Sequence, residues 1–297
     1  MNGVLVINKP TDFTSFDAVA VTRRVSGQRK TGHCGTLDPN ATGVLPVLLG
    51  VATKAQDILP NHDKEYIAEL KFGLESDTLD IWGEILREEK SSVTREELEK
   101  IIPNFTGDIM QVPPMYSALK QNGQRLYDLA RQGIEVKREA RKITIYSLTL
   151  LDFNESEQSA KLRVSCSKGT YIRSLIDDLG KALGTVAVMT SLCRTQACGF
   201  SLSDSVSMDE LKAMTKEDVR ARLLPVESLF VRYREVNVSQ AQSTRFRNGG
   251  ALGVERLRSL PKDFAQGEIF RVKFGEDFLG LGTIKETELK IFKLFHR

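Results

Sequence analysis

The 297-residue sequence is poor in the features that mark several large protein classes. It has no apolar run approaching the roughly 20 residues of a membrane-spanning helix. Its first ten residues lack a basic region followed by an apolar stretch and a cleavage site, so we expect no secretion signal. Four cysteines without CxxC spacing and three histidines do not form a zinc pattern. We therefore expect a cytoplasmic protein with reduced thiols, no metal and no membrane partner.

The sequence also has no excess of acidic residues. The net charge is +3, and residues from Arg234 onward contain 12 basic and 8 acidic side chains, against 30 and 31 in the preceding 233 residues. A basic C-terminal part is typical of a small module that contacts phosphates, although solvated surface charge would give the same count. The hydrophobic fraction of 41% and charged fraction of 27% are ordinary for a globular protein.

Hydrophobic periodicity predicts alternating strands and helices up to about residue 233. Tyr66, Ala68, Leu70 and Phe72 alternate with more polar residues, which indicates a half-buried strand. A helix begins after Thr14 or Ser15, and a capping box starting at Thr94 opens another that ends before Pro103. Further helices are expected at 125–131 and 171–183. Further strands are expected at 4–7, 142–153, 160–167 and 185–200, and the last of these could be broken into two strands.

The pattern after residue 233 indicates a separate structural unit. We expect a short helix at 239–247, a turn at Gly249-Gly250, and closely spaced strands at 267–274, 278–285 and 289–295. The length exceeds the usual size of one domain. We therefore predict an α+β domain at 1–233 and a compact, mostly β domain at 234–297.

The most informative stretch runs from Gly32 to Pro46 and reads GHCGTLDPNATGVLP. Its glycines allow the backbone to turn and approach a ligand, and Pro39 restricts Asp38 to extended geometry. Apolar residues 44–49 anchor the loop to a core strand. Such a loop presents Asp38 from a rigid backbone, as binding and catalytic loops do. The alternative is a tight turn capped by Asp38, with His33 an ordinary surface or core histidine.

The whole stretch resembles the catalytic-aspartate signature of the TruB family of tRNA pseudouridine synthases at every position that the signature specifies. Four further segments resemble that family in the same order: 64–66, 76–80, 112–133 and 166–180. The resemblance spans most of residues 1–200. The C-terminal unit resembles a PUA domain, a small RNA-binding barrel, by order and position only. One departure is Cys193, where the family commonly has an arginine near the RNA path.

The resemblance implies a pseudouridine synthase fold of the α+β class. Its sheet is mixed and mostly antiparallel, with flanking helices and a central cleft, followed by the PUA-like module. It implies isomerisation of uridine 55 in the T arm of tRNA. The glycosidic bond breaks, the uracil turns, and C5 bonds to C1′. This reaction involves no redox change or energy input, so no cofactor is implied.

Three residues receive catalytic roles from the resemblance. Asp38 either attacks C1′ or removes a sugar proton. It must remain charged in a dry pocket, where desolvation raises the pKa of a carboxyl group. Arg173 is expected to pair with this carboxylate in two places. Tyr66 is expected to stack on the uracil and to accept or relay the C5 proton.

Substrate contacts are expected from a second set of residues. The target base must leave its stack, and His33 is expected to fill the gap or stack on neighbouring bases. Tyr171 is expected to line the pocket. The segment 115–133 is expected to close over the RNA arm. Asp80 and Leu192 are included from their motif positions, and candidate contacts to the RNA backbone are Lys9, Lys64, Arg131, Lys168 and Arg194.

Two other functions remain open on sequence. The scaffold could serve a non-catalytic RNA-binding or RNA-folding protein, although the complete set of Asp38, Tyr66 and Arg173 favours an enzyme. A guide-RNA-dependent synthase of the archaeal or eukaryotic type is the third option. The short basic tail favours the stand-alone bacterial form, acting as a monomer on tRNA.

Overall fold

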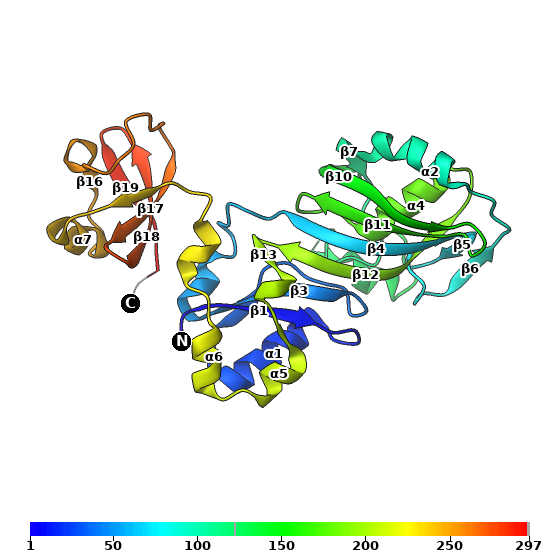
Figure 1. Cartoon of the computed structure of the whole chain (residues 1–297), viewed down its shortest axis with the longest axis horizontal. Coiled ribbons are helices and arrows are strands. Elements are labelled where there is room, and N and C mark those ends of the chain that lie inside the picture. The colour runs from blue at the N-terminus through cyan, green and yellow to red at the C-terminus, as the bar shows by residue number, and fades with distance from the viewer. Residues whose placement is uncertain (122, 296–297) are drawn as a thin grey trace.

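The computed structural model describes residues 1–121 and 123–295 (Figure 1). Its main feature is a ten-stranded sheet with the strand order β14-β1-β3-β12-β4-β11-β10-β7, in which β2 also pairs with β3 and β13 with β12. The strands are β1 (Gly3–Lys9), β2 (Thr31–His33), β3 (Thr42–Leu49), β4 (Lys64–Phe72), β7 (Gly107–Gln111), β10 (Arg141–Asn154), β11 (Ser159–Cys166), β12 (Ala187–Ala197), β13 (Phe200–Ser201) and β14 (Val206–Ser207).

The sheet is mixed and mostly antiparallel, as predicted. Only the β1–β14 and β3–β12 pairs among the described strands of this sheet are parallel. Strand β12 contacts β3 over two residue pairs only, of which one is Arg194 with Gly43. Gly43 has φ +105°, and a Cβ atom there would lie 2.2 Å from the Arg194 carbonyl oxygen. A glycine is therefore required at the point where the two halves of the sheet meet.

Helices cover the sheet where the sequence pattern predicts them. Helix α1 (Ser15–Ser26) begins after Thr14, whose side chain accepts a hydrogen bond from the Asp17 amide. Helix α4 (Ile172–Ala182) buries Leu175, Ile176 and Leu179 against the sheet. The predicted helices near residues 95 and 126 are α2 (Arg95–Ile101) and α3 (Leu126–Ala130).

The sequence analysis missed two helices and several short strands. Helices α5 (Met208–Ala213) and α6 (Lys216–Arg222) pack near α1, and each has a capping box that could have revealed it. The short strands are β5 (Leu74–Ser76), β6 (Ile85–Glu88), β8 (Lys120–Gln121) and β9 (Gln124–Arg125), and 3-10 turns occur at Gly50–Ala55, Ile102–Phe105, Leu202–Asp204, Val226–Phe230 and Val254–Arg256.

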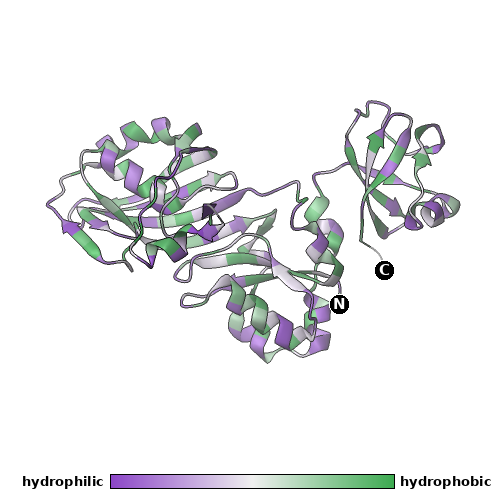
Figure 2. Ribbon diagram, turned by 180° about the vertical axis from the view of Figure 1, so that it is seen from behind, coloured by the Kyte–Doolittle hydropathy of each residue, from purple (hydrophilic) through white to green (hydrophobic). Residues whose placement is uncertain are grey.

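Residues 235–294 build a second sheet, with the order β15-β17-β18-β19-β16. Its elements are β15 (Glu235–Asn237), α7 (Gln240–Arg247), β16 (Leu252–Gly253), β17 (Ile269–Phe274), β18 (Asp277–Lys285) and β19 (Glu288–Leu294). This sheet has its own core around Phe246, Phe270 and Leu289. It touches the larger body through stacked and tilted rings of Phe230, Phe278 and Phe295. Figure 2 shows that the segment joining the two bodies is hydrophilic.

In the part of the chain that the structure describes, no helix is both long and apolar enough to cross a membrane.

One carboxyl group on α4 predicts a pH-dependent stability. Burial raises the pKa of Asp178 to about 6, and the neighbouring Asp177 carboxylate adds to the rise. The folded chain therefore holds this proton more tightly than the unfolded chain. The resulting stabilisation is present below the usual Asp pKa of 3.8 and is lost as the pH rises through 6. We expect Asp178→Asn to raise the melting temperature at pH 7 more than at pH 4.

The control for this prediction is Asp209→Asn, because Asp209 on α5 is 94% exposed. Melting temperatures followed by circular dichroism at both pH values provide the measurement. An Asp178→Asn effect that is equal at pH 4 and pH 7 would contradict the assignment.

Candidate active site

A cleft of about 240 Å³ lies where the ends of β4 and β12 meet the start of α4. Six of the residues singled out in the sequence line it: Asp38, Lys64, Tyr66, Tyr171, Arg173 and Leu192. A larger cavity of about 600 Å³ lies beside α4, but its lining contains none of these six. The smaller cleft is therefore the candidate active site.

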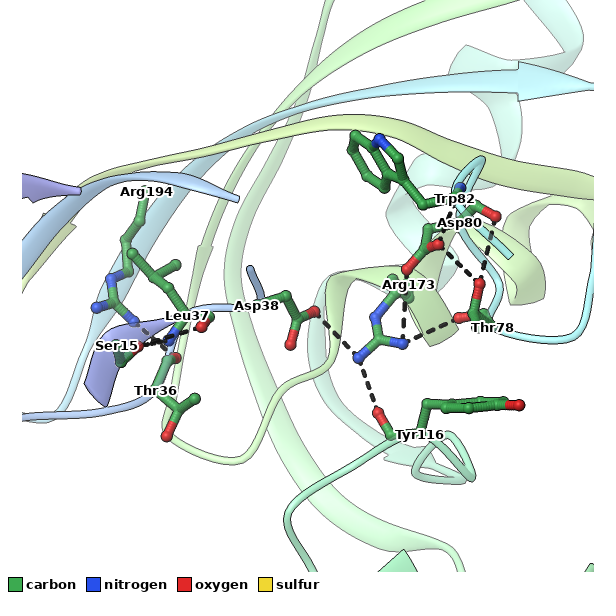
Figure 3. Close-up of polar contacts among 10 residues, drawn as sticks. All are labelled: Ser15, Thr36, Leu37, Asp38, Thr78, Asp80, Trp82, Tyr116, Arg173 and Arg194. Atoms are coloured by element: carbon green, nitrogen blue, oxygen red, sulfur yellow. Dashed lines mark hydrogen bonds and ion pairs between the residues drawn. The ribbon is translucent and has the colours of Figure 1, made fainter. Parts of the chain in front are cut away.

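Asp38 and Arg173 form an ion pair in this cleft (Figure 3). The Arg173 Nη2 atom lies 3.0 Å from Asp38 Oδ2, and this is the single contact between the two groups. The expected pairing in two places is therefore wrong. The Arg173 side chain is 7% exposed, whereas that of Asp38 is 42% exposed, so the carboxylate is partly open to the cleft and not yet in a dry pocket.

The Arg173 guanidinium also bonds two backbone carbonyls. Its Nη1 donates to the Thr78 carbonyl at 3.0 Å and its Nη2 donates to the Tyr116 carbonyl at 2.9 Å. Figure 3 shows Asp80 on the opposite side of the guanidinium from Asp38. The Nη2 atom is therefore shared between Asp38 and the Tyr116 carbonyl, while Nη1 bonds Thr78 and lies near Asp80; these partners fix the guanidinium and leave only Nη2 in contact with Asp38.

Asp80 lies behind Arg173 and outside the lining of the cleft. It accepts hydrogen bonds from the Thr78 hydroxyl at 2.7 Å and the Trp82 amide at 3.2 Å, and its Oδ2 lies 3.7 Å from Arg173 Nη1. Burial raises the pKa of Asp80, while these hydrogen bonds and the Arg173 charge oppose the rise. We expected Asp80 to contact the substrate, but in the structure its carboxylate faces Arg173.

Two buried side chains hold the loop backbone on either side of Asp38. Ser15 Oγ accepts from the Leu37 amide at 2.8 Å and donates to the Leu37 carbonyl at 3.1 Å. Lys9 is fully buried, and its Nζ donates to the Pro39 carbonyl at 2.9 Å. Burial lowers the pKa of Lys9 to about 8. The predicted contact of Lys9 with the RNA backbone is wrong, because its ammonium group faces carbonyls inside the protein.

The predicted contact of Arg194 with the RNA backbone is also wrong. It is fully buried, and its guanidinium donates to three backbone carbonyls of the loop and the following strand. A phosphate contact by this side chain is excluded by its burial.

The two tyrosines face the cleft from different elements. Burial raises the pKa of Tyr66 to about 12, and the charge and hydrogen bond of Arg194 oppose the rise. Burial also raises the pKa of Tyr171, while the charges of Arg141 and Arg173 oppose the rise. Both hydroxyls are therefore protonated at neutral pH.

A buried amide, missed in the sequence analysis, positions the start of α4. The Gln111 side chain donates to the Tyr171 carbonyl at 3.0 Å and accepts from the Tyr171 amide at 2.9 Å. This pairing spans 60 residues of sequence and is not visible in any local pattern. It places Tyr171 and Arg173 at the cleft.

Four further predicted residues are His33, Lys64, Lys168 and Arg131. His33 ends β2 just before the loop, and burial lowers its pKa, so the imidazole is neutral at neutral pH. Burial likewise lowers the pKa of Lys64 within the cleft. Lys168 is exposed next to Gly169 at the rim, and Arg131 lies over the Tyr127 ring at 4.4 Å. Within the described residues, no group of three or more His, Cys, Asp or Glu side chains could hold a metal ion.

Comparisons with known proteins show the family of this chain. A family model described as TruB family pseudouridylate synthase, N-terminal domain, matches residues 23–172, and one described as tRNA pseudouridylate synthase B C-terminal domain matches residues 173–231. The chain is 46% identical over 298 residues to tRNA pseudouridine synthase B of Clostridium perfringens and 43% identical over 295 residues to that of Clostridium tetani. Each match covers 99% of both chains.

Solved structures share the fold. A chain from a Cbf5-Nop10-Gar1 complex matches with a TM-score of 0.75 at 25% identity, over 99% of this chain and 85% of that one. A chain from an H/ACA RNP bound to a substrate RNA containing 2′-deoxyuridine matches with a TM-score of 0.76 at 24% identity, with the same coverage. The predicted pseudouridine synthase fold with a C-terminal PUA-like module is confirmed.

Proposed function

Because this chain belongs to the TruB family of pseudouridylate synthases and isomerises uridine 55 of tRNA, we propose that the reaction takes place in the cleft beside Asp38. One observation supports this most strongly. The half-exposed Asp38 carboxylate faces a cleft while Arg173, itself buried, holds it from behind. Arg173 therefore fixes the direction in which this carboxylate faces the cleft.

In the proposed mechanism the ribose of a flipped uridine lies against Asp38. The carboxylate either attacks C1′ or removes a sugar proton, and the bond from C1′ to N1 breaks. The uracil then turns, and C5 bonds to C1′. Finally the C5 proton leaves, so that no atom is gained or lost apart from protons exchanged with water.

Tyr66 is proposed to stack on the uracil and to relay the C5 proton. Since the pKa of Tyr66 is raised to about 12, its hydroxyl is a phenol at the start of the reaction. It can therefore accept the C5 proton only as it passes its own proton on, through water or Tyr171. We propose Leu192 as an apolar wall of the same cleft.

The T arm is proposed to lie across the rim of the cleft. We propose that Lys64, in the lining of the cleft, and Lys168, exposed beside it, contact the RNA backbone, and that His33 lies near the space left by the flipped base. A neighbouring groove of about 350 Å³ adds four basic side chains, Lys120, Lys137, Arg138 and Arg141. We propose residues 1–233 as the catalytic domain and residues 234–297 as a second RNA-binding domain, in a monomeric cytoplasmic enzyme.

Tritium release tests the function and the T-arm proposal together. RNA labelled at C5 of uridine is expected to lose its label to water, because C5 exchanges its proton for the bond to C1′. A T-arm hairpin is expected to react with a kcat/KM within roughly tenfold of full tRNA, a difference of about 1.4 kcal/mol. Binding without release from either RNA would instead support a non-catalytic RNA-binding protein.

A further inference from the structure

Arg194 is a fully buried cation under the loop that carries Asp38. Its Nε donates to the Val44 carbonyl at 2.8 Å. Its Nη1 and Nη2 donate to the carbonyls of Thr36 and Gly35, each at 3.2 Å. All three nitrogens of the guanidinium therefore hold backbone oxygens around the loop (Figure 3 shows the bond to Thr36).

A positively charged side chain is unusual at a fully buried position such as that of Arg194. Among the described residues, no carboxylate lies within ion-pair distance of it, and the cations Lys9 and Lys64 are close enough for Arg194 to lower the pKa of each. A buried charge is costly unless it is well hydrogen-bonded. An apolar side chain could supply the packing alone at this position, so what the arginine adds is its three contacts with the backbone carbonyls around the loop.

The position of Arg194 links the two catalytic side chains. On β12 it pairs with Tyr66 of β4 on one side and with Gly43 of β3 on the other. Its side chain then reaches the loop that precedes β3, two and three residues before Asp38. The same residue therefore contacts the strand of Tyr66 and the backbone of the Asp38 loop.

We propose that Arg194 is a positioning residue that sets the placement of Asp38 relative to Tyr66 and makes no contact with RNA. This rests on the proposed roles of Asp38 and Tyr66. The planar guanidinium is required because its nitrogens point in fixed directions toward three separate carbonyls. A lysine ammonium is a single point that cannot reproduce them.

The test compares Arg194→Lys and Arg194→Met with the matched pair Arg163→Lys and Arg163→Met. Arg163 is an exposed arginine on strand β11 of the same sheet, separated from β12 by β4. Single-turnover tritium release and tRNA affinity by filter binding are measured for each, at temperatures where circular dichroism shows the variant folded. We expect the rate of Arg194→Met to fall by roughly 100-fold, because a small misplacement of reacting groups costs about that much.

The two substitutions distinguish positioning from general damage. Arg194→Lys keeps the charge and part of the bonding, so its rate is expected between those of Arg194→Met and the unmodified enzyme. The tRNA Kd and its salt dependence are expected to stay unchanged for both, because removing a phosphate contact would lower the salt slope by about one. The Arg163 variants are expected to keep the unmodified rate.

Two results would overturn the proposal. One is an unchanged single-turnover rate in folded Arg194→Lys and Arg194→Met. The other is a weakened Kd with a reduced salt slope and no loss of rate, which would make Arg194 an RNA contact after all. Failure of the proposed function is distinguishable from both, because the unmodified enzyme would then release no tritium.

Discussion

Asp38→Asn is expected to abolish tritium release while tRNA affinity stays within roughly tenfold, about 1.4 kcal/mol. The amide has nearly the shape of the carboxylate, but it has no charge with which to attack C1′ or remove a sugar proton. The loop is expected to keep its conformation, because Ser15, Lys9 and Arg194 hold its backbone and not the Asp38 side chain. Single-turnover tritium release and filter binding measure the two effects.

The matched control for Asp38→Asn is Asp209→Asn, the same chemical change at an exposed position of α5. Its turnover is expected to equal that of the unmodified enzyme. Near-normal turnover in Asp38→Asn would show that the chemistry lies elsewhere.

Arg173→Met is expected to have the second-largest effect, on both turnover and stability. It removes the only ion-pair partner of Asp38 among the described residues, together with two hydrogen bonds to the carbonyls of Thr78 and Tyr116. It also leaves Asp80 buried without its cation. Breaking a buried charge network of this kind costs roughly 3–5 kcal/mol of folding free energy. We expect turnover to fall by more than about 100-fold, because Asp38 loses both orientation and charge stabilisation.

Arg173→Lys is the conservative comparison. It keeps a positive charge near Asp38, but one ammonium cannot serve Asp38, Thr78 and Tyr116 together. We expect partial recovery of stability and little recovery of turnover. Urea unfolding and single-turnover rates provide the measurements.

The control for both variants is Arg95→Lys, because Arg95 forms an exposed pair with Glu99 one helical turn away. Such pairs contribute only about 0.3–0.5 kcal/mol. An Arg173→Met variant that is as stable and active as Arg95→Lys would remove Arg173 from the mechanism.

Much of the architecture was predictable because it depends on local rules. Alternation along residues 65–72, the N-cap candidates Thr14 and Ser15 and the capping box at Thr94 predicted a strand and two helices in the right places. Helices α5 and α6 carry equally clear capping boxes and were missed, although the same local rule applies to them. The strands of two residues, such as β8 and β14, were missed because pairing across the sheet defines them and no periodicity does.

The sequence by itself determined the identity of the loop around Asp38 and its family, because a long ordered motif is a local property of the chain. Only the tertiary structure decided which way the cations near that loop point. Lys9 and Arg194 have the charge that a phosphate contact needs, yet both face backbone carbonyls inside the protein. Which carbonyls are available to a buried donor depends on how β3, β4 and β12 meet, and that is settled by packing between segments about 150 residues apart.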